Sequence, residues 1–148
     1  MGHDRAARLG ETRLMKQITV AAGIVLNTQQ QLLLVRKHNT RFFMQVGGKL
    51  EPDEAPEHCI LREIEEEIGC QAKKIIQYVG RFETAAANEP DHLLVSHVFQ
   101  VELTNSPKIA AEIAELKWIE LDDQSTPLAP LTREIVLPWV RQYLKIQA

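Results

Sequence analysis

Three glutamates near the end of one short helical segment are the residues whose types and spacing point most directly to chemistry. Glu63 lies three and four positions before Glu66 and Glu67, just ahead of Gly69. A helix C-terminus carries roughly half a negative charge, so each carboxylate there costs about 0.3–1 kcal/mol. Like-charged pairs at these spacings cost about 0.2–0.5 kcal/mol each. Because a divalent cation reverses the sign of these terms, the sequence predicts a metal site here.

The available donor atoms favour a hard ion. The chain has only two cysteines, Cys59 and Cys70, which we expect to be buried reduced thiols, and five histidines without ligand spacing. Oxygen-only ligands select Mg²⁺ or Mn²⁺ over zinc or copper, and Mg²⁺ usually also takes phosphate oxygens of a substrate. Gly47, Gly48 and Lys49 suit such a phosphate, because paired glycines let the backbone approach a ligand and lysine supplies a point charge.

The position of the acids around the helix is set by its apolar stripe. At about 100° per residue, Ile60, Ile64 and Ile68 share one face, and the three glutamates line the edge of that face. We therefore expect the acidic row at the boundary between core and water, neither buried nor fully solvated. Glu65 falls on the far side and is expected to be solvated.

Apolar patterning predicts the elements that must hold this helix. Runs of apolar and β-branched residues predict strands at 18–26, 31–36, 42–46, 72–83, 93–103 and 116–121. The first two are expected to form a hairpin across the polar turn 27–30, and Gly47–Gly48 is expected to stop the third. The helix should begin near Ala55–Pro56 and end at Gly69. Helical spacing over 135–144 predicts a C-terminal amphipathic helix, which Pro138 kinks or delays.

Size and composition favour one mixed α+β domain. The chain has 148 residues, of which 45% are hydrophobic and 25% charged. Residues 1–14 are polar and aperiodic, so we expect an N-terminal extension followed by a domain at 15–148. The net charge of −3 gives no sign of a nucleic-acid or membrane-surface partner, although eight of the 20 acidic residues lie within 51–67. No apolar run approaches the roughly 20 residues of a membrane span, so we predict a cytoplasmic protein.

The acidic segment resembles a known motif, the Nudix box. That motif has the form G-x5-E-x7-R-E-U-x-E-E-x-G-U, where U is a bulky aliphatic residue. Gly48, Glu54 and the run Arg62-Glu63-Ile64-Glu65-Glu66-Glu67-Ile68-Gly69 meet every fixed position, and only Cys70 departs, at the final aliphatic position. Val46 stands where family members often have proline. The resemblance extends over about residues 17–144 and implies the α/β/α sandwich of the family, with the box as loop and helix.

The resemblance also implies roles for individual residues. The implied ligands of Mg²⁺ or Mn²⁺ are Glu63, Glu66, Glu67 and the backbone carbonyl of Gly47. Arg62 would orient the catalytic glutamates by pairing with Glu54. The base that activates water is either Glu63 or a glutamate from a later loop, for which Glu112 and Glu115 are the candidates.

The implied activity is hydrolysis of a pyrophosphate bond in a nucleoside diphosphate-linked compound. The short chain favours a (d)NTP, split into a nucleoside monophosphate and pyrophosphate. A nucleotide sugar, a dinucleoside polyphosphate or a non-hydrolytic nucleotide-binding regulatory module are the alternatives. Substrate contacts are expected from Gly48, Lys49, Arg36 and Phe43, with the connection at 87–90 as a further border. The expected partner is a small nucleotide. The sequence is compatible with a homodimer as well as with a monomer.

Overall fold

Two β-sheets form the centre of the protein in this computed structural model, which describes residues 15–147. The extension predicted at 1–14 lies outside the described residues. The larger sheet contains β1 (Lys16–Ile24), β3 (Val46–Lys49), β4 (Ala72–Ala85) and β5 (His92–Leu103), in the order β3-β1-β5-β4. Its β1 and β5 are parallel and its other neighbours antiparallel. The smaller sheet pairs β2 (Leu32–Lys37) antiparallel with β6 (Ile113–Ile119).

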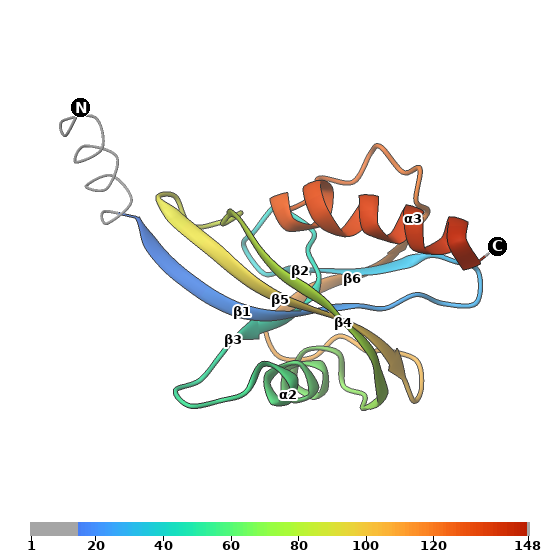
Figure 1. Cartoon of the computed structure of the whole chain (residues 1–148), viewed down its shortest axis with the longest axis horizontal. Coiled ribbons are helices and arrows are strands. Elements are labelled where there is room, and N and C mark those ends of the chain that lie inside the picture. The colour runs from blue at the N-terminus through green and yellow to red at the C-terminus, as the bar shows by residue number, and fades with distance from the viewer. Residues whose placement is uncertain (1–14, 148) are drawn as a thin grey trace.

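Helices cover the larger sheet from both sides (Figure 1). Helix α2 (Pro56–Ile68) lies on one side, and α3 (Leu137–Gln147) lies on the other. Neighbouring residues of β1 point to opposite faces, so Ala21 belongs to the same apolar cluster as Ile64 of α2, and Ala22 to the same cluster as Val140 of α3. The predicted α+β sandwich is therefore confirmed, with one apolar core under each helix. No helix within residues 15–147 is long and apolar enough to cross a membrane.

The turn at 27–30 is present, but the predicted hairpin extends only over the residues next to it. The Asn27 side chain accepts hydrogen bonds from the backbone N–H groups of Gln29 and Gln31, at 3.0 and 2.9 Å. Leu26 and Leu32 then form a single antiparallel bridge. Beyond it the strands separate, because β1 pairs with β3 and β5 while β2 pairs with β6. Both strands carry long buried apolar runs, so periodicity did not specify their partners.

Gly47 and Gly48 lie inside a strand and do not stop one, contrary to the prediction. They pair with Ala22 and Ala21 of β1. The predicted strand at 42–46 makes only isolated bridges before β3 begins. Gly47 has φ +153°, and a Cβ there would lie 2.0 Å from the carbonyl oxygen of Ala21. The glycines therefore serve close backbone approach rather than a turn. Because β3 is the end strand of its sheet, its other edge has no strand neighbour within residues 15–147.

The C-terminal helix is preceded by one wider helical turn. The turn η1 (Thr132–Val136) is π-helical, and Leu137 donates its backbone N–H to the carbonyl of Thr132, five residues earlier. Pro138 has no N–H for the usual bond to the residue four positions earlier. The predicted helix over 135–144 is thus present, and α3 itself begins at Leu137, next to the proline. The strand predicted at 116–121 begins earlier, at Ile113.

Candidate metal and phosphate site

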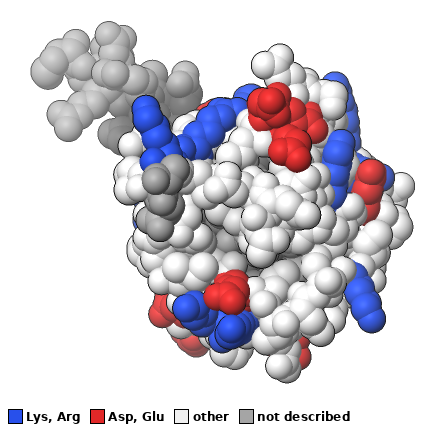
Figure 2. All heavy atoms as spheres, turned by 90° about the vertical axis from the view of Figure 1, so that its right-hand side faces the viewer, with Lys and Arg blue, Asp and Glu red and all other residues white. Residues whose placement is uncertain are grey.

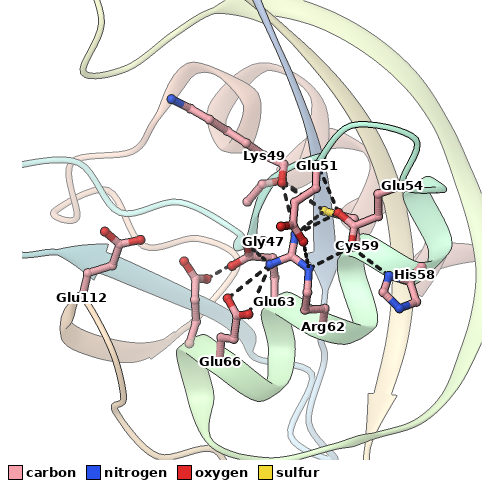
Figure 3. A network of polar contacts seen from close by, with 12 residues as sticks. Gly47, Lys49, Glu51, Glu54, His58, Cys59, Arg62, Glu63, Glu66 and Glu112 are labelled. Carbon is pink, nitrogen blue, oxygen red and sulfur yellow. Dashed lines mark hydrogen bonds and ion pairs between the residues drawn. The ribbon is translucent and has the colours of Figure 1, made fainter.

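Arg62 lies at the centre of a network of acids on α2 and the loop before it (Figure 3). Its Nε and Nη2 bond the two carboxylate oxygens of Glu54 at 2.8 and 2.9 Å. Its Nη1 donates to Glu63 at 3.1 Å and to Glu66 at 3.2 Å. Glu51 approaches Nε at 3.2 Å. One guanidinium therefore contacts four carboxylates, and the predicted pair of Arg62 with Glu54 is present.

Glu54 is held as a charged partner of Arg62. The hydrogen bonds from Arg62 hold the pKa of Glu54 well below its usual range, and the same bonds raise the pKa of Arg62. Glu54 also accepts the backbone N–H of Glu51 at 3.0 Å and contacts Nδ1 of His58 at 2.8 Å. Its side chain is only 6% exposed. This arrangement fixes the guanidinium, which in turn fixes two of the predicted metal ligands.

The three predicted ligands differ in solvent exposure, from a buried to an exposed side chain. Glu67 is 2% exposed, the side chain of Glu63 is 13% exposed, and that of Glu66 is 53% exposed. The expectation that all three lie at the boundary is therefore wrong for Glu67, because it points under β3 and accepts the N–H of Gly47 at 3.0 Å. Burial raises the pKa of Glu67 to about 7 and also raises that of Glu63.

The glycine backbone of β3 packs directly on α2. A Cβ at Gly48 would lie 2.4 Å from the carboxylate of Glu63, so a side chain there would displace that carboxylate from its present position. The Cys59 thiol donates to the carbonyls of Gly48 and Lys49 at 3.4 and 3.5 Å. Burial raises the pKa of Cys59 to about 11, which keeps it a neutral donor. Cys59 and Cys70 are buried and unpaired, as predicted.

The structure separates the two later glutamates. Glu112 precedes β6, and its charge raises the pKa of Glu67, so the two carboxylates share one region. Glu115 instead lies opposite Arg36 in the two-stranded sheet and pairs with it at 3.3 Å. The prediction that Glu115 serves the site has no support in this placement, because the register of β2 and β6 commits it to Arg36.

Lys37 is a site residue that the sequence analysis missed. Its Nζ lies 3.7 Å from Glu112, and its positive charge lowers the pKa of both Glu63 and Glu67. The residue also lines the cavity beside the site. It stands at the end of an ordinary apolar strand, so no motif or spacing marked it.

A cavity of about 340 Å³ begins at the same glycine backbone. Its lining includes Gly47, Gly48 and Lys49 and the segments 85–89 and 129–131. The predicted contacts Gly48 and Lys49 are thus beside the cavity, as is most of the connection at 87–90. Arg36 and Phe43 are not, because Phe43 is buried in the core and Arg36 lies 5.9 Å over its ring. The Nζ of Lys49 lies 3.8 Å from the carboxylate of Glu89, and both residues line the cavity.

The donor set suits a hard divalent ion, although its members are not gathered around one point. Within residues 15–147, no three Asp, Glu, His or Cys side chains are grouped closely enough to hold a metal ion as they stand. The Nη1 of Arg62 bonds both Glu63 and Glu66 and supplies the positive charge between them. Within the described residues, the buried Glu67 carboxylate accepts one hydrogen bond, from the N–H of Gly47, and burial raises its pKa to about 7. A bound cation would stabilise its charged form.

A second hollow, of about 690 Å³, lies near the β1–β2 turn and the segment 105–107. None of its lining residues belongs to the acid network. Figure 2 views the side of the molecule that is on the right in Figure 1, and it shows charged side chains mainly around the margin of that face. The first cavity, by contrast, is lined by Gly47 and Gly48, which contact Glu67 and Glu63 of the acid network.

Comparison with known proteins agrees with this geometry. A family model described as NUDIX domain matches residues 15–140. An 8-oxo-dGTP diphosphatase from Escherichia coli (strain K12) is 27% identical over 111 residues, covering 72% of this chain and 83% of that protein. A CTP pyrophosphohydrolase from the same organism is 28% identical over 138 residues, covering 90% and 96%. A relative from Bacillus subtilis (strain 168) is 33% identical over 98 residues, 65% of this chain, and is matched over only 62% of its own length.

The solved structures support the same fold. A MutT NUDIX hydrolase from Burkholderia pseudomallei superposes with a TM-score of 0.71 at 22% identity, covering 83% of this chain and 97% of that one. This chain belongs to the NUDIX domain family. The predicted membership and the predicted enzyme class, a Nudix-type nucleotide pyrophosphohydrolase, are confirmed.

Proposed function

We propose that this protein hydrolyses a nucleoside triphosphate to a nucleoside monophosphate and pyrophosphate with the help of Mg²⁺ or Mn²⁺. The observation that carries the proposal is that the acid network and the cavity meet at one strand. Glu67 and Glu63 contact Gly47 and Gly48 from the side of α2. The cavity begins at the same two glycines. A nucleotide in the cavity would therefore have its phosphates beside the acids.

The cation would be held by an all-oxygen set. Its members are Glu63, Glu66, Glu67 and the backbone carbonyl of Gly47, which suit Mg²⁺ or Mn²⁺. Such an ion neutralises charge on the pyrophosphate and lowers the pKa of a bound water. Arg62 keeps the carboxylates of Glu63 and Glu66 close together, and Lys37 and Lys49 offer positive charge to the phosphates.

The attacking water also needs a carboxylate that accepts its proton. Glu63 accepts a hydrogen bond from Arg62 at 3.1 Å, whereas among the described side chains the Glu112 carboxylate approaches only that of Lys37, at 3.7 Å. The carboxylate of Glu112 is therefore freer than that of Glu63 to accept a proton from water. We assign Glu112 as the base, with Glu63 as the second candidate. A phosphate that draws Lys37 away would release Glu112 for this role.

The size of the cavity supports a mononucleotide. At about 340 Å³ it is near the lower limit of ligand pockets, which span roughly 300–1,000 Å³. One nucleoside suits this space better than the second nucleoside or sugar of a dinucleoside polyphosphate or nucleotide sugar. The relatives named for 8-oxo-dGTP and CTP also act on nucleoside triphosphates.

The test is an assay of (d)NTPs with Mg²⁺ and Mn²⁺, with quantification of monophosphate and pyrophosphate. We expect Glu67→Gln to lower kcat at least 100-fold, because a neutral amide is a poor ligand for a hard cation. The matched control is Glu65→Gln, on the exposed side of the same helix, which should retain wild-type kcat. Hydrolysis in excess chelator, or full activity of Glu67→Gln, would refute the proposal. Nucleotide binding without hydrolysis would instead favour the regulatory alternative.

A further inference from the structure

The cavity contains one buried amide, that of Gln45. Of the polar side chains among its described lining residues, Gln45 alone is buried, with 5% of its surface exposed. The other polar lining residues, Thr40 and Asn88 among them, are partly or fully exposed. Gln45 lies two residues before Gly47, so in extended backbone the two point to the same face. That face is the one on which Ala22, the partner of Gly47, also lines the cavity.

Two hydrogen bonds fix the orientation of this amide. Its Nε2 donates to the carbonyl oxygen of Gly23 at 3.0 Å, and its Oε1 accepts from the hydroxyl of Thr132 at 2.9 Å. A backbone carbonyl can only accept, so the nitrogen must face Gly23. A primary amide has two N–H groups and two acceptor positions on its oxygen. One donor and one acceptor position of Gln45 therefore have no partner within the described residues.

The cavity walls near Gln45 offer few other hydrogen-bonding side chains. The neighbouring walls of the cavity are aliphatic, with Ala22, Leu94 and Leu131 among them. A buried donor without a hydrogen-bond partner carries a desolvation penalty. A ligand group that accepts its hydrogen bond removes this penalty and is favoured by that free energy. A site that hydrogen-bonds a substrate group rejects the analogue that lacks that group. The amide is thus the feature of this cavity most able to distinguish one ring edge from another.

We propose that Gln45 is a specificity-determining residue that binds a nucleobase edge carrying a hydrogen-bond acceptor next to a donor. The free N–H of the amide would donate to the acceptor, and its oxygen would accept from the donor. Guanine offers such an edge through its ring carbonyl and adjacent N–H, whereas unsubstituted purine has no donor beside its ring nitrogen. The inference rests on one part of the proposed function, namely that the nucleoside of the substrate binds in this cavity.

The test is a binding cycle that needs no turnover. Calorimetry in Mg²⁺ buffer compares GMP with the 5′-monophosphate of purine riboside, on the wild type and on Gln45→Met. We expect the wild type to bind GMP roughly threefold to tenfold more tightly, the value of a net hydrogen bond. In Gln45→Met, which keeps the length of the side chain and removes the amide, the two affinities should become equal.

The matched control is Thr132→Val. It removes the hydroxyl that bonds the same amide but leaves Gln45 anchored to Gly23, so the preference for GMP should persist. Because each preference is a ratio measured on one protein, a reduced folded fraction leaves it unchanged, and Gln45→Leu serves if Gln45→Met does not fold. Equal binding of both ligands by the wild type, or an unchanged preference in the Gln45 variant, would overturn the inference. Absence of hydrolysis would overturn only the proposed function.

Discussion

At the scale of single residues, Glu67 has the least ordinary environment in the site. It is a buried carboxylate with one N–H partner, and burial raises its pKa from 4.5 to about 7. Since the folded protein binds this proton more tightly than the unfolded chain, the stabilisation is fully present below pH 4.5 and is lost as the pH rises through 7.

The first prediction concerns this proton. In excess chelator, the free energy of unfolding of the wild type should fall by about 2–3 kcal/mol between pH 5 and pH 8. Glu67→Gln should remove most of that slope, because the amide stays neutral and its oxygen can still accept the N–H of Gly47. Urea denaturation at several pH values measures both. Parallel pH profiles for the two proteins would show that Glu67 does not titrate in this range.

The second prediction contrasts the two glycines of β3. A methyl group at Gly48 meets the end of the Glu63 side chain, which can move, whereas one at Gly47 meets the backbone of Ala21. Gly48→Ala should therefore cost about 1 kcal/mol or less of stability but lower Mg²⁺ affinity at least tenfold by displacing Glu63. Gly47→Ala should cost about 2 kcal/mol or more. Thermal melts and calorimetric Mg²⁺ titrations test the pair, and equal effects on stability would contradict it.

At the scale of elements, the loop between β6 and η1 is tied down by Asp123. Its carboxylate accepts the backbone N–H groups of Ser125 and Thr126 at 2.7 and 3.0 Å, and these bonds lower the pKa of Asp123 to about 2. The Thr126 hydroxyl in turn accepts from Lys117 at 2.8 Å. Since the same loop continues into 129–131, which lines the cavity, this network positions one wall of it.

The third prediction removes that network. Asp123→Ala should destabilise the protein by about 1 kcal/mol near neutral pH, since the exposed side of the carboxylate is screened by water. The folded pKa lies below the ordinary 3.8, so the wild type should lose this contribution as the pH falls from about 4 toward 2. The free energies of unfolding of the wild type and of Asp123→Ala should therefore converge as the pH approaches 2. We also expect a higher KM with little change in kcat, and a variant with raised stability at pH 7 would contradict the assigned role.

How far the sequence predicted these elements depended on whether the signal was local. Helix α2 begins at Pro56 and ends before Gly69 as expected, because cap residues act within one turn. The proposed metal ligands Glu63, Glu66 and Glu67 could be grouped from the sequence for the same reason, since they share one helix. Strand partners depend on distant contacts, so the pairing of β2 and the place of β3 were not found. Lys37 and Gln45 were missed likewise, because only strand pairing brings them to the cavity.

At the scale of the whole molecule, the larger sheet separates two apolar cores with different consequences for the site. Ile64 lies in the core under α2, the helix that carries the acids, and Val140 lies in the core under α3. Both side chains are fully buried. Loss of packing under α2 should reach the acids directly, whereas loss under α3 should not.

The fourth prediction follows from that separation. Ile64→Ala should cost about 2–5 kcal/mol of stability and also weaken Mg²⁺ binding, because the helix shifts into the space left behind. Val140→Ala should cost about 1–3 kcal/mol and leave Mg²⁺ affinity unchanged. Denaturant titrations and calorimetry on both variants provide the comparison. A matching loss of Mg²⁺ affinity in the two variants would show that the cores are not independent.

The open edge of β3, with acids on one side and the cavity beyond it, has a consequence for product departure. A nucleotide that reaches both regions is anchored at two points, and its covalent tether gives the second anchor a high effective concentration. Scission of the pyrophosphate bond cuts that tether, so each fragment keeps a single anchor. We expect inhibition constants for monophosphate and for pyrophosphate at least ten times the dissociation constant of the intact ligand, as product-inhibition kinetics would measure. Bond cleavage would then itself promote product release, without a conformational change that opens the site.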